Sequence, residues 1–128
     1  MSYYLSKTVD DDFDAVISKV TEALKQEGFG VLTEIDVKET LKKKLDVDFR
    51  KYKILGACNP HFAHQALQAE ANIGTMLPCN VIVQENKNGT IEISAVDPVA
   101  SMMAVKHDAL GDIAMQVKEK LQRVVDNL

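Results

Sequence analysis

The stretch that decides the fold runs from Tyr52 to Glu85 and reads YKILGACNPHFAHQALQAEANIGTMLPCNVIVQE. It contains both cysteines, two of the three histidines and two of the three prolines of the chain. Its first half predicts a strand that leads directly into a helix, because Asn59 is a good N-cap residue and Pro60 suits the first helical position. Its second half predicts a strand that begins at Pro78, where a missing N–H does least harm.

The two cysteines lie in matching corners of this stretch, GACNP (residues 56–60) and LPCNV (residues 77–81). If the two strands are antiparallel neighbours, the end of the first lies beside the start of the second. Cys58 and Cys79 would then share one rim of the sheet, and the helix that carries His61 would begin beside them. We therefore expect a candidate site at this rim.

Gly56 lies inside the first predicted strand of the stretch. A glycine there costs roughly 0.5–1 kcal/mol relative to alanine, so it indicates a bulge or a close approach by another backbone or a ligand. We therefore include Gly56 in a candidate ligand-binding site. No residue is assigned a catalytic or a metal-binding role. The full set is Gly56, Cys58, Asn59, His61, Cys79 and Asn80.

Outside this stretch, alternating residues predict three further strands. Residues 2–8 alternate weakly, and Asn88-Gly89 predicts a hairpin whose second arm ends at Asp97-Pro98. The segment that opens at Gly28 has charged residues on one face and a less polar set on the other: Phe29, Val31, Thr33, Ile35 and Val37. This pattern is typical of an antiparallel sheet with one face in the core and one in water.

Two long helices are predicted, one near each end of the chain. Aspartates from Asp10 onward favour a helix start, and a continuous apolar stripe follows in each of the segments 10–27 and 108–128. A short helix or turn is expected over 38–45. The order predicts a single α+β domain over 1–128, with an antiparallel sheet of about five strands covered on one face by two main helices.

Two apolar segments do not fit a regular pattern. Residues 71–77 have no periodicity and are predicted to be a loop that folds over something, and residues 99–105 have no assigned structure. Both segments exceed what the small sheet needs for its own core, and large apolar surfaces mark interfaces. They therefore predict a homodimer.

Composition excludes several classes of function. The net charge is -4 and the basic residues are scattered, which argues against nucleic-acid binding because that needs a concentrated positive surface. No apolar run reaches the roughly 18 residues of a membrane span, and no signal-peptide pattern opens the chain. We therefore expect a cytoplasmic protein without a membrane partner, whose two cysteines are reduced thiols.

Several of these motifs together resemble a known family. The GFGVL strand (residues 28–32), the GACNP corner, the LPCNV strand and the Asp97-Pro98 stop are similar to the bacterial and archaeal family called domain of unknown function three hundred and two. The resemblance runs from the helix after Asp10 to the terminal helix. It implies a fold similar to the TATA-binding-protein-like group, an α+β sandwich, and a homodimer. It implies no activity, substrate, cofactor or catalytic residue.

Two functions remain open from the sequence. The first is a non-catalytic homodimeric binding domain, with a small-molecule pocket near Cys58 and Cys79 that is closed by residues 73–77 and 99–105. The alternative is a thiol-dependent protein that handles a soft metal or redox equivalents, because thiolate and imidazole from Cys58, Cys79 and His61 suit copper(I) or zinc. No Cys-x-x-Cys motif, phosphate loop or catalytic acid pair supports an enzyme.

Overall fold

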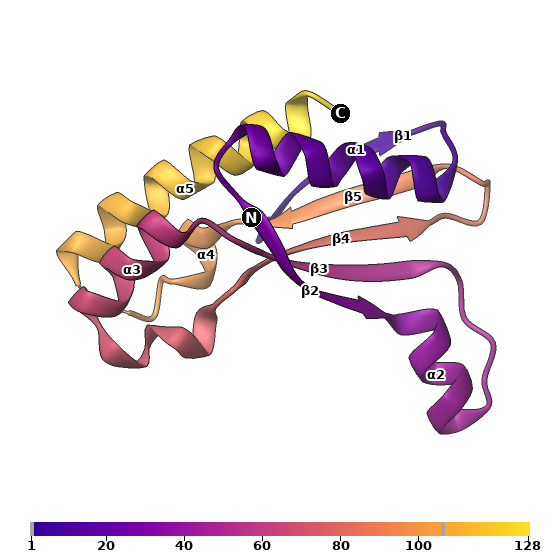
Figure 1. The fold of residues 1–128 in the computed structure, drawn as a ribbon, viewed down its shortest axis with the longest axis horizontal. Coiled ribbons are helices and arrows are strands. Elements are labelled where there is room, and N and C mark those ends of the chain that lie inside the picture. The colour runs from indigo at the N-terminus through magenta and orange to yellow at the C-terminus, as the bar shows by residue number, and fades with distance from the viewer. Residues whose placement is uncertain (1, 106) are drawn as a thin grey trace.

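The computed structural model describes residues 2–105 and 107–128 and confirms the predicted fold class (Figure 1). Five antiparallel strands form one sheet in the order β1-β5-β4-β3-β2. The strands are β1 (Tyr4–Val9), β2 (Gly30–Asp36), β3 (Tyr52–Cys58), β4 (Cys79–Glu85) and β5 (Ile91–Val96). The helices are α1 (Phe13–Gln26), α2 (Val37–Leu45), α3 (Pro60–Ala69), the 3-10 helix η1 (Ala71–Met76), α4 (Pro98–Ser101) and α5 (Asp108–Asp126).

The helix α1 begins and ends where the sequence predicts. The Asp12 carboxylate accepts a hydrogen bond from Ala15 N at 3.1 Å, which satisfies one of the free N–H groups of the first turn. Gly28 follows the helix with a φ of 85°, a left-handed conformation that glycine adopts without steric cost. The chain can therefore turn back at once, and Phe29 enters the core.

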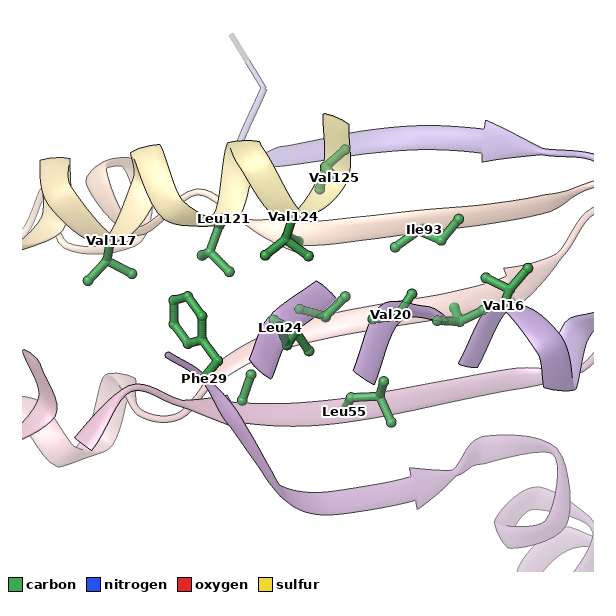
Figure 2. Packing of buried hydrophobic residues seen from close by; sticks show 14 of the residues in the cluster. Val16, Val20, Leu24, Phe29, Leu55, Ile93, Val117, Leu121, Val124 and Val125 are labelled. Atoms are coloured by element: carbon green, nitrogen blue, oxygen red, sulfur yellow. The ribbon is translucent and has the colours of Figure 1, made fainter. Parts of the chain in front are cut away.

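The hydrophobic core lies between the sheet and the two long helices (Figure 2). Val20 and Leu24 of α1 and Leu121 of α5 are fully buried against Leu55 and Ile93 of the sheet. The buried residues of each helix fall at intervals of three or four positions and form one stripe: Phe13, Val16, Val20 and Leu24 on α1, and Ile113, Val117, Leu121 and Val124 on α5. The apolar stripes predicted from sequence are therefore the faces that pack on the sheet.

The strand register gives the sheet two distinct faces. Leu55, Val81 and Ala95 stand opposite one another on adjacent strands and belong to what we call the covered face, because α1 and α5 pack on it. Their neighbours in sequence point the other way. That side, which the two long helices leave uncovered, is called the open face and carries Tyr4, Ser6, Thr8, Thr33, Ile35, Tyr52, Ile54, Gly56, Asn80, Ile82, Gln84, Glu92, Ser94 and Val96.

The second strand departs from its predicted pattern. The pairing of β2 with β3 shifts between Val31 and Thr33, which places Leu32 in a bulge and reverses the alternation after it. Ile35 consequently lies on the open face and is 48% exposed, and Val37 is the first residue of α2. The prediction that Phe29 to Val37 form one continuous core face is therefore wrong beyond the bulge.

The two irregular apolar segments have defined structure. Residues 71–77 are not a loop: most of them form η1, and Ile73 inserts into the core at 1% exposure. In the unassigned segment 99–105, the chain completes α4 as far as Ser101 and then turns. Asp97 caps α4 by accepting hydrogen bonds from Val99 N and Ala100 N. Both segments lie at the end of the sheet where β3 ends and β4 begins.

Candidate functional site

A cavity of about 270 Å³ opens at this end of the sheet, between the strand ends and helices α3, α4 and α5. Its walls are almost entirely apolar, and within residues 2–105 and 107–128 none of the residues that line it carries a charge. They are Phe29, Leu32, Ala57, Cys58, Asn59, Phe62, Ala63, Ala66, Leu67, Leu77, Pro78, Cys79, Pro98, Met102, Ile113, Ala114 and Val117. The cavity thus forms where the two segments inserted after β3 and β5 meet the first half of α5.

The two cysteines lie at the same rim, as the sequence predicts. Cys79 begins β4 opposite Ala57, the residue before Cys58, and both thiols are free, partly buried and part of the cavity wall. Burial, with a smaller contribution from the nearby Cys58, raises the pKa of the Cys79 thiol from an ordinary 9.0 to about 11. Cys79 is therefore a neutral thiol at physiological pH.

Asn59 lines the cavity but its amide group is engaged elsewhere. The side-chain oxygen caps α3 by accepting a hydrogen bond from Phe62 N at 3.4 Å. The side-chain nitrogen donates to the Glu27 carbonyl oxygen at 3.5 Å. Asn59 therefore ties the start of α3 to the end of α1, and its main role is to hold the cavity wall in place.

Gly56 is buried beside the cavity rather than in its lining. A side-chain Cβ at this position would lie 2.8 Å from Pro78 Cγ and closer still to Thr33 Oγ1. The close approach that the sequence predicts is thus made by two neighbouring side chains of the protein itself. Gly56 allows the bulged strand β2 and Pro78 to close over the rim.

The other two predicted site residues lie away from the cavity. His61 is exposed on α3, where its ring Nε2 lies 3.2 Å from Gln65 Nε2. Asn80 is exposed on the open face, one residue beyond Cys79, because side chains alternate along the strand. Of the six residues predicted, the cavity wall brings together Cys58, Asn59 and Cys79.

The arrangement does not provide a set of metal ligands. Within residues 2–105 and 107–128, no group of three or more His, Cys, Asp or Glu side chains lies close enough to hold an ion. His61 is turned outward because it follows Pro60 on the exposed side of α3, whereas Phe62 and Ala63 face inward. The helix that carries His61 thus begins beside the two cysteines, as the sequence predicts, but the His61 side chain is exposed and is not part of the cavity lining.

Several residues of the site could not be identified from the sequence. Ile113 and Val117 have the spacing of an ordinary core stripe, and only the fold shows that the first half of α5 extends past the sheet to the cavity. Met102 and Phe29 are likewise only apolar residues in the sequence, and the fold alone places them at the cavity. The best signal in the sequence was the apolar character of the segments 71–77 and 99–105.

The chain is similar to known proteins in both sequence and structure. A family model described as "Domain of unknown function DUF302" matches residues 5–128. A solved structure, described as the crystal structure of an uncharacterized conserved protein DUF302 from Bacillus stearothermophilus, is 32% identical, with 98% of each chain covered and a TM-score of 0.91. No curated protein matches the chain. No helix within the described residues is long and apolar enough to cross a membrane.

Proposed function

This chain belongs to the DUF302 family, and we propose that it is a non-catalytic binding domain that holds a small, uncharged molecule in the cavity near Cys58 and Cys79. The observation that carries this proposal is the cavity itself, an apolar space of about 270 Å³ at the rim of the sheet. Small-molecule sites are typically concave and apolar, with few polar groups that fix the orientation of the ligand.

The lining determines the class of ligand. In the part of the chain that the structure describes, no charged side chain lines the cavity, so an ionised group placed there would lose its hydration without gaining a partner among these residues. Asn59 is already hydrogen-bonded through both ends of its amide. A cavity of about 150 Å³ holds benzene, so this space suits a neutral, mostly hydrocarbon molecule with on the order of ten non-hydrogen atoms.

The chemistry of the lining supports binding rather than catalysis. A cysteine nucleophile needs a thiolate and a nearby base. Burial instead keeps the Cys79 thiol protonated by raising its pKa to about 11, and His61 lies outside the lining. The aromatic rings of Phe29 and Phe62 and the sulfur atoms of Cys58, Cys79 and Met102 offer polarisable contacts that suit a flat apolar ligand.

A cavity-filling substitution tests the proposal. Ala63→Phe would place a ring in the cavity, whereas Gln65→Phe adds the same ring to the exposed side of the same helix. We expect the wild type and Gln65→Phe to bind a neutral naphthalene-type fluorescent probe, and Ala63→Phe to bind it at least tenfold more weakly. Equal binding by Ala63→Phe, or no binding by the wild type, would overturn the proposal. Native mass spectrometry of freshly purified protein would show any retained molecule directly.

The thiol-dependent alternative draws on one observation, that Cys58 and Cys79 share the cavity wall. A soft metal such as copper(I) accepts thiolate and thioether ligands, and Met102 also lines the cavity. Anaerobic titration with copper(I) tests this candidate. Stoichiometric binding that is lost in Cys58→Ser and Cys79→Ser would favour it over the apolar-ligand proposal.

We also propose that the binding domain is a homodimer. The apolar segments 71–77 and 99–105, which predicted a dimer from the sequence, now give less support for one. Ile73 belongs to the core of the monomer, and Met102 belongs to the cavity wall. Met103, at 69% exposure, remains on the surface. The stronger support comes from the open face of the sheet. The expectations of no nucleic-acid partner and of a cytoplasmic location stay predictions.

A further inference from the structure

We infer that the open face of the sheet is the surface on which a second copy of this chain docks. This inference rests on the proposed homodimer and not on the cavity or its ligand. It names the interface, which lies on the opposite side of the sheet from the two long helices.

The first observation is where the charged side chains of the strands lie. The exposed side of an antiparallel sheet is normally polar, because it faces water. Among the strand residues that the structure describes, Glu92 is the only charged one on the open face. The covered face, by contrast, carries charges around its margin: Lys7, Glu34, Asp36, Lys53 and Glu85.

The side chains on the open face are of the types that are common in protein–protein interfaces. Tyr4, Tyr52, Ile54, Ile82 and Val96 extend across four adjacent strands of it. Interface cores are depleted in charged residues and enriched in aromatic ones. Neutral polar residues fill most of the remaining positions. The face thus resembles a surface that is buried against protein more than one that is hydrated.

Three polar residues of the open face, Gln84, Glu92 and Ser94, form one hydrogen-bond network with Arg50. Arg50 donates two hydrogen bonds to Gln84 Oε1, at 3.1 and 2.9 Å, and Gln84 Nε2 donates to Glu92 Oε1 at 3.2 Å. Ser94 Oγ donates to the same Glu92 oxygen at 3.4 Å, and Ser94 is only 6% exposed. An arginine and a glutamate in one network also bring no net charge to the face. A second copy could therefore cover it without like-charge repulsion.

The open face carries both a hollow and exposed aromatic rings beside it. A hollow of about 330 Å³ lies on it, lined by Tyr52, Asn80, Ile82, Gln84, Glu92, Ser94, Ala95 and Val96 together with Tyr3 and Tyr4. Tyr3 is 72% exposed and Tyr4 40% exposed at the margin of the hollow. In a two-fold dimer each copy presents the same patch to the other. In the proposed dimer, we expect a tyrosine ring of one copy to fill the hollow of its partner.

The size of the face matches what a dimer needs. Five strands of six or seven residues span about 24 Å by about 20 Å, which is on the order of 500 Å² in projection. Two copies together would bury about 1,000 Å², the lower bound for a specific interface, and the relief of the side chains adds to it. The sheet edges are less suitable, because β2 carries a bulge and β1 has Lys7 turned inward.

Sedimentation analysis of the full chain tests the inference. Ile82→Lys places a charge at the centre of the open face, and Leu45→Lys is a control on α2, where Leu45 is 66% exposed. We expect the wild type and Leu45→Lys to be dimers at about 50 μM and Ile82→Lys to be a monomer, with the dissociation constant raised at least a hundredfold. Circular dichroism would show that each variant is folded.

The outcomes separate the interface from the dimer itself. A monomeric wild type at about 50 μM would overturn both the homodimer and this inference. A wild-type dimer with a folded, dimeric Ile82→Lys would overturn the interface and leave the homodimer. If Ile82→Lys does not fold, Ser6→Arg decides in the same way, because Ser6 is exposed on the open face of the edge strand β1. Probe binding is measured separately, so a failure of the cavity proposal would not affect this result.

Discussion

On the covered face, Leu55, Val81 and Ile93 lie beneath α1 and α5 and are fully buried. On the open face, their sequence neighbours Ile54 and Ile82 lie beneath neither long helix and are partly buried. The environments differ, but the centres of both faces are apolar. The chain's own helices thus cover one apolar face, and the second is the face on which we propose that another copy docks.

The charged residues are also distributed differently between the two faces. They surround the covered face, where the helices end and water begins, and are nearly excluded from the open face. A charged residue at the margin of a core costs little, because its head group stays in water. On the open face, similar charges would oppose burial by a second copy.

The largest effect is expected at two adjacent residues of β3. Leu55 is 0% exposed on the covered face, so Leu55→Ala should lower the free energy of unfolding by about 2–5 kcal/mol through lost burial and the cavity left behind. Ile54→Ala, on the open face, should cost clearly less in a dilute sample, where the protein is monomeric. Urea denaturation measures both changes.

The effects of the two β3 substitutions should depend differently on protein concentration. If a second copy covers the open face, the cost of Ile54→Ala should grow as the concentration rises, because the variant weakens the dimer as well as the fold. The cost of Leu55→Ala should stay constant. An Ile54→Ala cost equal to that of Leu55→Ala in dilute solution would contradict the division of the sheet into one core face and one docking face.

The sequence predicted the parts of the fold that depend on local patterns. The stripe of α5 and the hairpin around Asn88-Gly89 are confirmed, because their spacing and turn chemistry are contained in a few consecutive residues. The position of Cys58 and Cys79 at one rim was also predictable, since strand direction alone determines it. Each of these features needs no knowledge of distant contacts.

The remaining features depend on contacts between distant segments. The bulge in β2 accompanies the close packing of Thr33 and Pro78 around Gly56, and no alternation pattern reveals it. The exposure of His61 depends on how α3 is rotated against α5, which its spacing from Cys58 does not determine. The two faces of the sheet likewise become distinct only once the register of all five strands is known.

A smaller effect is expected at Gly56, where the open face is tightly packed. A methyl group in Gly56→Ala would overlap Thr33 Oγ1 and approach Pro78 Cγ at 2.8 Å, so we expect a loss of about 1–3 kcal/mol in unfolding free energy. Thr33→Gly in the same chain removes the nearest obstacle and should recover part of that loss. A stable Gly56→Ala, or an absence of recovery, would show that this contact does not constrain the rim.

The smallest effect concerns Cys79, which lies at the cavity end of the covered face. Its pKa is about 11 in the folded protein against 9.0 ordinarily, so the unfolded chain releases this proton at lower pH than the folded one. The resulting stability is therefore complete below pH 9 and is lost as the pH rises toward 11. At about pH 10 the loss should be on the order of 1 kcal/mol.

Denaturation at neutral pH and at about pH 10 measures this contribution, because alkaline effects of other groups are common to all variants. Cys79→Ala should lose less stability between the two conditions than the wild type. Cys58→Ala should keep most of the wild-type loss, since burial is the larger cause of the raised pKa at Cys79 and Cys58 the smaller. Identical pH profiles for the wild type and Cys79→Ala would mean that water reaches the Cys79 thiol. The cavity wall would then be open where the proposed apolar ligand needs it closed.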